Sequence, residues 1–456
     1  MNLPAYPKYK PSGVEWLGDV PEHWHSHRVK WAVSGCINGV WGDDPDGVDD
    51  VICVRVADFD RDNLVVVPDP PTMRAIEPRQ LRYRQLQRDD LLIEKSGGGE
   101  QQLVGRVVSF NHDYRAVCSN FVARMVVTGE APSRFWCYVH AAMYSGRLNY
   151  PAIKQTTGIQ NLDAEAYLDT PAPFPPISEQ KAIAAFLDRE SARIDRLVAK
   201  KRELIERLKE KRTALIFRTV TRGLPPAAAR AAGLPENPSL KPSCIEWLGD
   251  IPSHWDVSKI THGFALIGSG TTPKSDSEEF YDGDVAWVTT SELRESVILS
   301  TKERVTLTAL AAHPTLRIYP AGTLLFAMYG ATIGRLGILG IPATVNQACC
   351  AFAQPTRFVT RYVFYWLWMR RPILVSLSSG GGQPNLSQDD LRQVRLTVPP
   401  KDEQLAIAEY LDVETARIDA LLAKVETAVE RLQEYRTALI TAAVTGKIDV
   451  RREVSA

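Results

Sequence analysis

Two sequence motifs each occur twice in the chain, and this duplication limits its possible folds more than any other feature. Residues 14–24 read VEWLGDVPEHW, and residues 245–255 read IEWLGDIPSHW. A longer pair follows, in which residues 176–221 match residues 400–445 without a gap and share the strings EQ, AIA, ARID and RTALI. Internal duplication of this kind indicates repeated structural units. We therefore expect two units, each followed by the same kind of segment.

The two repeated segments have the pattern of long amphipathic helices. Their seam positions step alternately by three and four residues, which is typical of a heptad seam. A helix of about 40 residues with one exposed apolar stripe needs a partner. Its simplest partner is the other copy, which carries net charge of the opposite sign, and packing on its own domain is the alternative. The seam comprises Leu187, Glu190, Ile194, Leu197, Lys201, Leu204, Leu208, Lys211 and Leu215 in the first helix, and Leu411, Glu414, Ile418, Leu421, Val425, Ala428, Leu432, Tyr435 and Leu439 in the second.

Composition places the chain among ordinary globular proteins. Its 456 residues are 45% hydrophobic and 24% charged, with no net charge, so any nucleic-acid binding must use local patches. The seven cysteines form no CxxC pair, which predicts neither a disulfide framework nor a zinc site. The N-terminal residues lack an apolar signal core, and no apolar run reaches the length of a bilayer span. We therefore expect a cytoplasmic protein with reduced thiols.

The duplication divides the chain into six segments. Between the repeated motifs, both halves are expected to be mixed α/β domains of about 150 residues. Their strand-like runs are Val51–Val56, Leu64–Val67, Gly105–Ser109, Val285–Thr289, Thr323–Ala327 and Gly337–Leu339. The prediction is an α+β chain with a first domain at 1–175, a first helix at 176–222, a Pro/Ala-rich linker at 223–242, a second domain at 243–399, a second helix at 400–447 and a tail at 448–456.

The ends of the two domains are the first candidate site for contact with DNA. Asn161-Leu162 aligns with Asn385-Leu386 at the same spacing as the helices, and Ser387 with Asp390 predicts a capping box. The preceding loops are rich in Gly, Thr and Gln, which suits contacts to phosphates and base edges. A mobile surface loop is the alternative interpretation. The candidate contacts are Lys154, Gln155, Thr157 and Gln160 in the first domain and Gly381 and Gln383 in the second.

Basic residues elsewhere form a second set of candidates. Runs of charge are usually solvated surface, and that is the alternative for each of them. Arg106 and Arg335 each follow a glycine and are possible paired positions of the two domains. The other candidates are Arg82 and Arg84 within a basic run that also includes Arg74, Arg79, Tyr83 and Arg88, and Thr271, Thr272 and Lys274 in the loop GTTPK.

No motif in the chain predicts catalysis. The phosphate-binding signature GxxxxGK[ST] is absent from the sequence. Residues 171–176, PAPFPP, lack the acidic or amide residue of an amino-methyltransferase loop, and Glu94-Lys95 lacks the spacing of a nuclease site. The eight histidines show no metal-ligand spacing, and His23 and His254 beside the repeated tryptophans are interpreted as structural. We expect no catalytic and no metal-binding residues.

Taken together, these strings resemble the specificity subunits of type I restriction–modification systems (the HsdS family). The resemblance rests on the two EWLGDxPxHW strings and the two EQxAIAxxLDxExARIDxLxAK helices, and it extends over nearly the whole chain. The second half, with GTTPK at 270–274 and GGGQPNLS at 380–387, is similar to a common form of the family's target-recognition domain. The first half departs from it, since TTGIQNLD replaces the Gly-rich string.

The resemblance implies a division of labour between this chain and its partners. Each target-recognition domain would read one half of a bipartite, asymmetric DNA site, and the helices, paired as an antiparallel coiled coil, would set the spacing. Two methyltransferase subunits that use S-adenosylmethionine would dock on the chain. In the full enzyme, restriction subunits that use ATP and Mg²⁺ would join them, so this chain would need no cofactor. A coiled-coil scaffold without DNA binding and a single-chain enzyme with a divergent active site are the alternatives.

Overall fold

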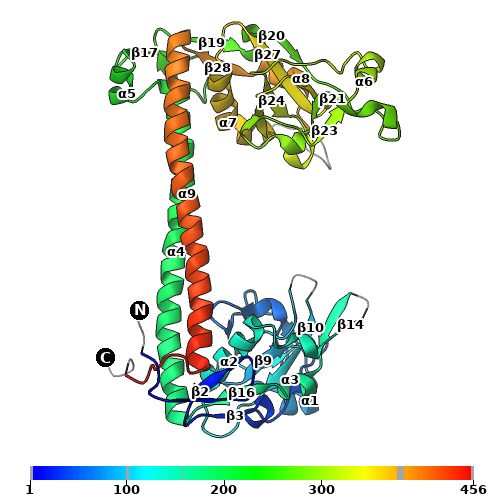
Figure 1. Ribbon diagram of the computed structural model, residues 1–456, viewed down its shortest axis with the longest axis vertical. Coiled ribbons are helices and arrows are strands. Elements are labelled where there is room, and N and C mark those ends of the chain that lie inside the picture. The colour runs from blue at the N-terminus through cyan, green and yellow to red at the C-terminus, as the bar shows by residue number, and fades with distance from the viewer. Residues whose placement is uncertain (1–3, 99–101, 157, 377–384, 453–456) are drawn as a thin grey trace. The chain divides into compact units, whose positions relative to one another are not determined.

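A computed structural model describes residues 4–98, 102–156, 158–376 and 385–452 of the chain. These residues form two compact units (Figure 1). Unit 1 comprises Met1–Glu203 and Val425–Ala456, and unit 2 comprises Leu204–Lys424. Two long helices, α4 (Ile177–Arg222) and α9 (Lys401–Val444), each contribute one part to unit 1 and the other part to unit 2.

Unit 1 is built around a six-stranded sheet in the order β4-β13-β9-β11-β7-β6. The central strand β9 is fully buried, in keeping with its continuous apolar run of Leu91, Leu92 and Ile93. A second sheet has the order β12-β5-β8, and helix α2 packs on β11. The elements before α4 are β1 (Tyr9–Pro11), β2 (Asp19–Pro21), β3 (His25–Arg28), η1 (Val29–Trp31), β4 (Ile37–Asn38), β5 (Val51–Val54), η2 (Val56–Asp58), β6 (Phe59–Asp60), β7 (Val65–Val66), β8 (Met73–Arg74), α1 (Pro78–Arg84), β9 (Leu91–Glu94), β10 (Ser96–Gly97), β11 (Val107–Ser109), β12 (Ala116–Cys118), β13 (Val122–Met125), α2 (Ser133–Ser145), η3 (Tyr150–Ala152), β14 (Ile153–Thr156), β15 (Ile159–Leu162), α3 (Ala164–Leu168) and β16 (Pro171–Phe174).

Unit 2 repeats this topology with different residues. Its main sheet has the order β20-β27-β24-β25-β22, and its second sheet has the order β23-β21-β26. The elements between α4 and α9 are α5 (Pro226–Ala231), β17 (Leu240–Pro242), β18 (Asp250–Pro252), β19 (Asp256–Lys259), η4 (Ile260–Gly263), β20 (Phe264–Gly268), η5 (Glu278–Phe280), β21 (Tyr281–Val288), η6 (Thr290–Glu292), β22 (Val297–Ile298), β23 (Glu303–Val305), α6 (Leu307–Ala312), β24 (Leu324–Ala327), η7 (Gly330–Thr332), β25 (Leu336–Leu339), β26 (Thr344–Val345), β27 (Cys349–Pro355), α7 (Thr360–Ser376), α8 (Gln388–Gln393) and β28 (Arg395–Val398).

The strand register fixes which residues of the two units correspond. In unit 1, β9 lies antiparallel between β13 and β11, and β11 lies parallel to β7. In unit 2, β24 lies antiparallel between β27 and β25, and β25 lies parallel to β22. Ile93 faces Val107 as Phe326 faces Leu336. The two units therefore share one fold, although their sequences differ strongly between the repeated motifs.

Within each unit the parts of the two long helices pack against each other in opposite directions. In unit 1 the Oδ1 atom of Asp195 lies 3.4 Å from Nε of Arg436, and further back along α4 Glu179 lies 3.8 Å from Arg451 beyond the end of α9. In unit 2 Arg212 forms the corresponding ion pair with Asp419 at 3.0 Å. The antiparallel pairing of the two helices is thereby confirmed inside each unit.

The heptad seam expected from the sequence is correct in part. Leu187 and Ile194 are buried, but Leu197 and Leu204 are 40% and 43% exposed. In unit 1 the helix buries Val198 instead of Leu197, because Val198 lies only about 40° around the helix from Ile194. At this point the buried face therefore follows the 3.6-residue period of an α-helix. It no longer follows the strict alternation of three-residue and four-residue steps that the heptad pattern predicts.

The repeated tryptophan strings anchor the start of each long helix. In unit 1 the indole of Trp24 donates to Glu179 Oε2 at 2.9 Å, and His23 Nε2 lies 2.6 Å from Glu179 Oε1. Trp24 also lies against Gly446, which follows α9. This contact is structural, as the sequence predicts for His23. The contact joins the tryptophan motif and the long-helix repeat, which are the two duplicated motifs, in one buried cluster.

Candidate nucleic-acid interface

The hairpin β14–β15 in unit 1 presents the first candidate residues. Gly158 has a φ of +85°, which glycine adopts without strain and which lets the chain reverse between the strands. Lys154 and Gln155 are exposed on β14, and the Lys154 ammonium lies 2.8 Å from the Asp163 carboxylate. Gln160 is only 3% exposed, and its Oε1 atom accepts a hydrogen bond from the Val104 backbone. Gln160 is therefore largely buried and helps to hold the segment at Val104, and its predicted contact with DNA is untested. Thr157 lies outside the described residues.

The basic run predicted as a patch is partly neutralised by distant acidic residues. Arg88 forms a bidentate pair with Asp113, with distances of 2.8 and 2.6 Å. Arg74 is paired with Asp44 and lies over the Trp41 ring. The members with more available charge lie on α1, where Arg82 is exposed and the half-buried Arg84 donates to the Asn38 carbonyl. The helix thus offers a smaller cationic surface than the count of arginines indicates.

In unit 2 the loop GTTPK is held close to the second sheet. A Cβ atom at Gly270 would meet the carbonyl of Val345 at 1.6 Å, so only glycine fits there. The carbonyl of Thr271 accepts from the Trp287 indole at 3.3 Å, and the Thr272 hydroxyl donates to Gln347. Lys274 is exposed. Close packing of the backbone leaves the side chains of Thr272 and Lys274 on the surface.

Arg106 and Arg335 lie at the same point of the two folds. The carbonyl of Arg106 accepts from the Glu94 amide, and the carbonyl of Arg335 accepts from the Ala327 amide, each at 2.9 Å. Their expected equivalence is confirmed. Their settings differ, because Arg335 is exposed whereas Arg106 is half-buried and stacks on Tyr144 with its guanidinium carbon 4.3 Å from the ring centroid.

The aligned ends of the two domains also correspond. The amide of Leu162 donates to the carbonyl of Lys95, and the amide of Leu386 donates to the carbonyl of Met328, each at 2.8 Å. Lys95 and Met328 follow the equivalent strands β9 and β24. The Ser387 capping box is confirmed at the start of α8. Gly381 and Gln383 lie outside the described residues, so their predicted contacts with DNA are untested.

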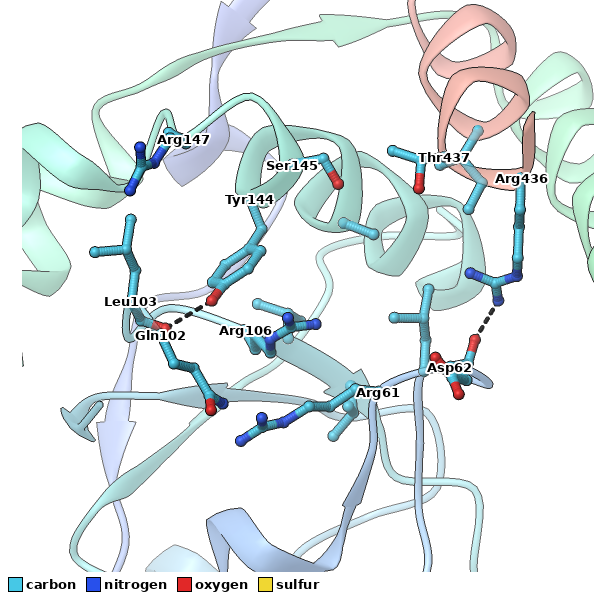
Figure 2. A pocket seen from close by; sticks show the side chains of 15 residues that line it. Arg61, Asp62, Gln102, Leu103, Arg106, Tyr144, Ser145, Arg147, Arg436 and Thr437 are labelled. Carbon is cyan, nitrogen blue, oxygen red and sulfur yellow. Dashed lines mark hydrogen bonds between the residues drawn. The ribbon is translucent and has the colours of Figure 1, made fainter. Parts of the chain in front are cut away.

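Two cavities in unit 1 contain polar residues that the sequence does not single out. The first has a volume of about 400 Å³ and is lined by residues that include Arg61, Arg106, Arg147 and Arg436 (Figure 2). The second, of about 490 Å³, is lined by residues that include Trp41, Glu94 and Phe121. Burial raises the pKa of the Glu94 carboxyl, and Arg61 and Arg106 oppose this shift. Arg106 is a candidate from the sequence, but no sequence motif marks Arg61, Arg147 or Arg436, because these side chains converge only through the tertiary fold.

Around the second cavity, equivalent positions of the two units differ in chemistry. Ala327 occupies the position of Glu94, and Met328 that of Lys95. The Lys95 amide donates to the carbonyl of Phe121, whereas the Met328 amide donates to that of Ala348, so Ala348 takes the place of Phe121. An acid, a base and an aromatic ring in unit 1 thus correspond to three apolar residues in unit 2. One scaffold thus carries different side chains at these largely buried positions.

Comparisons with known proteins agree on one family. Residues 252–431 match the model of the type I restriction modification DNA specificity domain. The type I restriction enzyme MjaIX specificity subunit of Methanocaldococcus jannaschii is 31% identical over 168 residues, which are 36% of this chain and 38% of that protein. The MjaVIII specificity subunit of the same organism is 25% identical over 68% of this chain and 70% of its own length. The alignment with the first relative thus spans less than half of that relative's length.

Solved structures share the fold over nearly the whole chain. One, described as the structural basis underlying complex assembly and conformational transition of the type I R-M system, has a TM-score of 0.65 at 16% identity and covers 93% of this chain and 98% of its own. The crystal structure of the HsdS subunit from Thermoanaerobacter tengcongensis has a TM-score of 0.55 at 15% identity, with coverage of 94% and 98%. Residues 252–431 thus match the type I restriction modification DNA specificity domain, and the chain as a whole shares the fold of solved structures of type I restriction–modification specificity subunits.

No helix in the described ranges is long and apolar enough to cross a membrane. The same ranges contain no group of three or more His, Cys, Asp or Glu side chains placed to hold a metal ion.

Proposed function

We propose that the two units read the two halves of a bipartite, asymmetric DNA site. One observation carries this proposal: the units share a fold, and equivalent positions differ in side chain or in exposure, such as the exposed Phe121 against the buried Ala348 and the half-buried Arg106 against the exposed Arg335. A shared scaffold places both reading surfaces in the same way relative to their own helices. Different side chains on that scaffold select different bases, because each base pair presents its own pattern of donors and acceptors in the major groove.

The long helices serve as the frame of this assembly. Each unit is closed by parts of both α4 and α9, with the ion pairs Asp195–Arg436 and Arg212–Asp419 at corresponding places. We propose that these helices set the gap between the two half-sites. They would also dock two methyltransferase subunits, to which restriction subunits are added in the complete enzyme. Methylation and cleavage, with S-adenosylmethionine, ATP and Mg²⁺, belong in this proposal to the partners.

A domain exchange tests the proposal, and the structure indicates where the exchanged segment should begin and end. Strands β3 and β16 pair antiparallel where the chain enters and leaves the first domain, with Arg28 opposite Pro171. Residues 29–170 are replaced by the corresponding segment of another specificity subunit, and the chain is co-expressed with its methyltransferase. Mapping of methylated bases across a genome should show that one half of the motif changes and the other stays.

The matched exchange in unit 2 uses the pair β19 and β28, with Lys259 opposite Arg395, and should change only the other half. A change of both halves by either exchange would contradict the division of labour. Methylation that continues at the original motif after both exchanges would show that these domains do not read DNA.

A further inference from the structure

The first cavity of unit 1 has a strongly uneven charge. Four guanidinium groups line it, and the carboxylate of Asp62 is the single acidic group among its lining residues (Figure 2). Arg436 is compensated, because it pairs with Asp195 and also donates to the carbonyl of Asp62. Within the described ranges, the guanidinium groups of the other three, Arg61, Arg106 and Arg147, form no ion pair within 4.0 Å.

Arg106 is positioned in this cavity by an aromatic ring and by the preceding glycine. Its guanidinium lies on the Tyr144 ring, and its Nε–H is buried without a hydrogen-bond partner. The preceding Gly105 has a φ of +104°, and a Cβ atom there would lie 3.2 Å from Asn149. The local backbone is therefore suited to glycine, and it positions Arg106 at the cavity. A buried donor with no acceptor is costly unless a ligand supplies the acceptor.

The cavity is open because of one small side chain. In unit 1, Arg134 of α2 pairs with Asp188 at 2.7 Å, and in unit 2 Arg361 of α7 pairs with Asp412 at the same distance. These pairs align the two helices. Two turns further along each helix, Ala141 lines the cavity of unit 1, whereas unit 2 has Trp368.

The tryptophan of unit 2 packs against the counterpart of a cavity residue. Arg212 corresponds to Arg436 in the duplicated helices, and its guanidinium carbon lies 4.5 Å from the centroid of the Trp368 ring. In unit 2 an indole thus fills the place that remains open in unit 1. At this position the two units therefore differ, with a small side chain beside the cavity in unit 1 and a large one in unit 2.

We propose that this cavity binds a phosphate group. Guanidinium groups match phosphate oxygens in charge and in the geometry of their donors, and desolvated pairs of this kind are strong. The amide of Gln102 and the hydroxyls of Ser145 and Thr437 also line the cavity and offer further donors. The volume of about 400 Å³ falls within the usual range for ligand sites. It leaves room for part of the molecule that carries the phosphate.

Two sources share this chemistry: the DNA backbone and a soluble phosphate ester. The first source rests on the proposed function, whereas the existence of the phosphate site does not. The first arm of the test uses inorganic pyrophosphate and the full chain, with binding measured by isothermal titration calorimetry. Ala141→Trp fills the cavity without changing charge, and Arg106→Gln removes the half-buried cation while leaving the cavity open.

Pyrophosphate should bind the unaltered chain at one site, and each of these two variants should weaken binding about tenfold or more. Ala141→Ser, which keeps the cavity open, and Arg317→Gln, which removes an exposed charge in unit 2, should bind as the unaltered chain does. Thermal melting establishes that the variants are folded, and Arg106→Gln decides the matter if Ala141→Trp does not fold. Absence of pyrophosphate binding, or equal binding by all five proteins, would overturn the proposal.

The second arm separates the two sources by measuring binding to duplex DNA. If the ligand is the DNA backbone, pyrophosphate competes with DNA, and Ala141→Trp lowers the affinity for both ligands by a similar factor. If the ligand is a soluble ester, the DNA affinity of Ala141→Trp is unchanged while pyrophosphate binding is lost. Both results support the phosphate site. Failure of the unaltered chain to bind DNA, with pyrophosphate binding intact, would refute the proposed function alone.

Discussion

In unit 2 the carboxylate of Glu403 accepts the indole N–H of Trp255 at 3.0 Å, with both side chains buried. The same Oε2 atom lies 2.8 Å from Nε2 of His254. The carboxylate comes from the first turn of α9, and the indole comes from the repeated tryptophan motif at the start of the second domain. Gly223, which follows α4, packs against the same indole. One buried group therefore ties together the entry to the domain, the start of one long helix and the end of the other.

Glu403→Ala should destabilise unit 2 by about 2–4 kcal/mol, since it leaves a buried indole donor and an imidazole without an acceptor. Glu403→Gln keeps an acceptor oxygen and should cost less. The free energies of unfolding are measured by chemical denaturation, with Glu409→Ala on the exposed side of the same helix as the control. An equal, small effect for all three substitutions would show that the cluster does not stabilise the unit.

Acidification should weaken unit 1 through His140. Burial lowers the pKa of this imidazole to about 4, against 6.5 for an unperturbed histidine, and its Nδ1 atom lies 2.6 Å from the Tyr167 hydroxyl. Between pH 6.5 and 4 the unfolded chain takes up a proton that the folded chain does not. The free energy of unfolding should therefore fall by about 3 kcal/mol over this range, with no contribution from His140 above it.

The comparison that isolates His140 is the pH dependence of unfolding in His140→Phe, since phenylalanine does not titrate. The difference between the unaltered chain and the variant should be constant above pH 7 and shrink as the pH falls. The exposed His25, replaced by glutamine, serves as the control. Parallel curves for the unaltered chain and His140→Phe would exclude this histidine as the cause.

Arg335 provides a test of electrostatic contact by unit 2. Within the described part of the chain its exposed guanidinium forms no ion pair within 4.0 Å, unlike the nearby Arg371, which pairs with Glu295. If Arg335 contacts a phosphate, Arg335→Gln should reduce the steepness of log K against log salt by about 0.9. Fluorescence anisotropy of the chain with the proposed methyltransferase partner at several salt concentrations measures this slope. An unchanged slope, equal to that of Arg317→Gln, would remove Arg335 from the interface.

Matched insertions test whether the helices set the gap between half-sites. Four helical residues are added between Glu203 and Leu204 in α4 and four between Lys424 and Val425 in α9, so that the antiparallel partners stay in step. Four residues add about 6 Å, and one base pair rises about 3.4 Å, so the gap should grow by one or two base pairs. The half-site sequences should not change. A methylating variant that keeps the original gap would show that helix length does not determine it.

The sequence predicts those features that are carried by local patterns or by the duplication. The long helices follow from their apolar period, the buried strand Leu324–Ala327 from its continuous apolar run, and the start of α8 from Ser387 and Asp390. The equivalence of Arg106 and Arg335 is also visible, because each follows a glycine before a strand. In all these cases the signal lies within a few residues of the structure that it predicts.

Features that depend on distant partners could not be predicted. Arg88 reads as an available cation, but Asp113 neutralises it. Gln160 reads as a polar loop residue, yet its backbone lies in a hairpin that buries its side chain against Val104. The cavity of unit 1 depends on Ala141, and nothing in the local sequence indicates that the equivalent position holds a tryptophan. Such relationships appear only when the two folds are compared strand by strand.

The amide of Asp449 donates to the carbonyl of Pro4 at 2.7 Å, so the segment after α9 returns to the segment that opens unit 1. In unit 2 the corresponding distance, from Gly223 to β17, is bridged by continuous chain through α5. Topologically the polypeptide is thus a ring that is covalently closed at one junction and held by hydrogen bonding at the other. The order in which a gene encodes the two units is then arbitrary: a circular permutant opened within residues 225–239, with a short peptide that joins Arg451 to Pro4, keeps the ion pairs and strand pairings described within each unit.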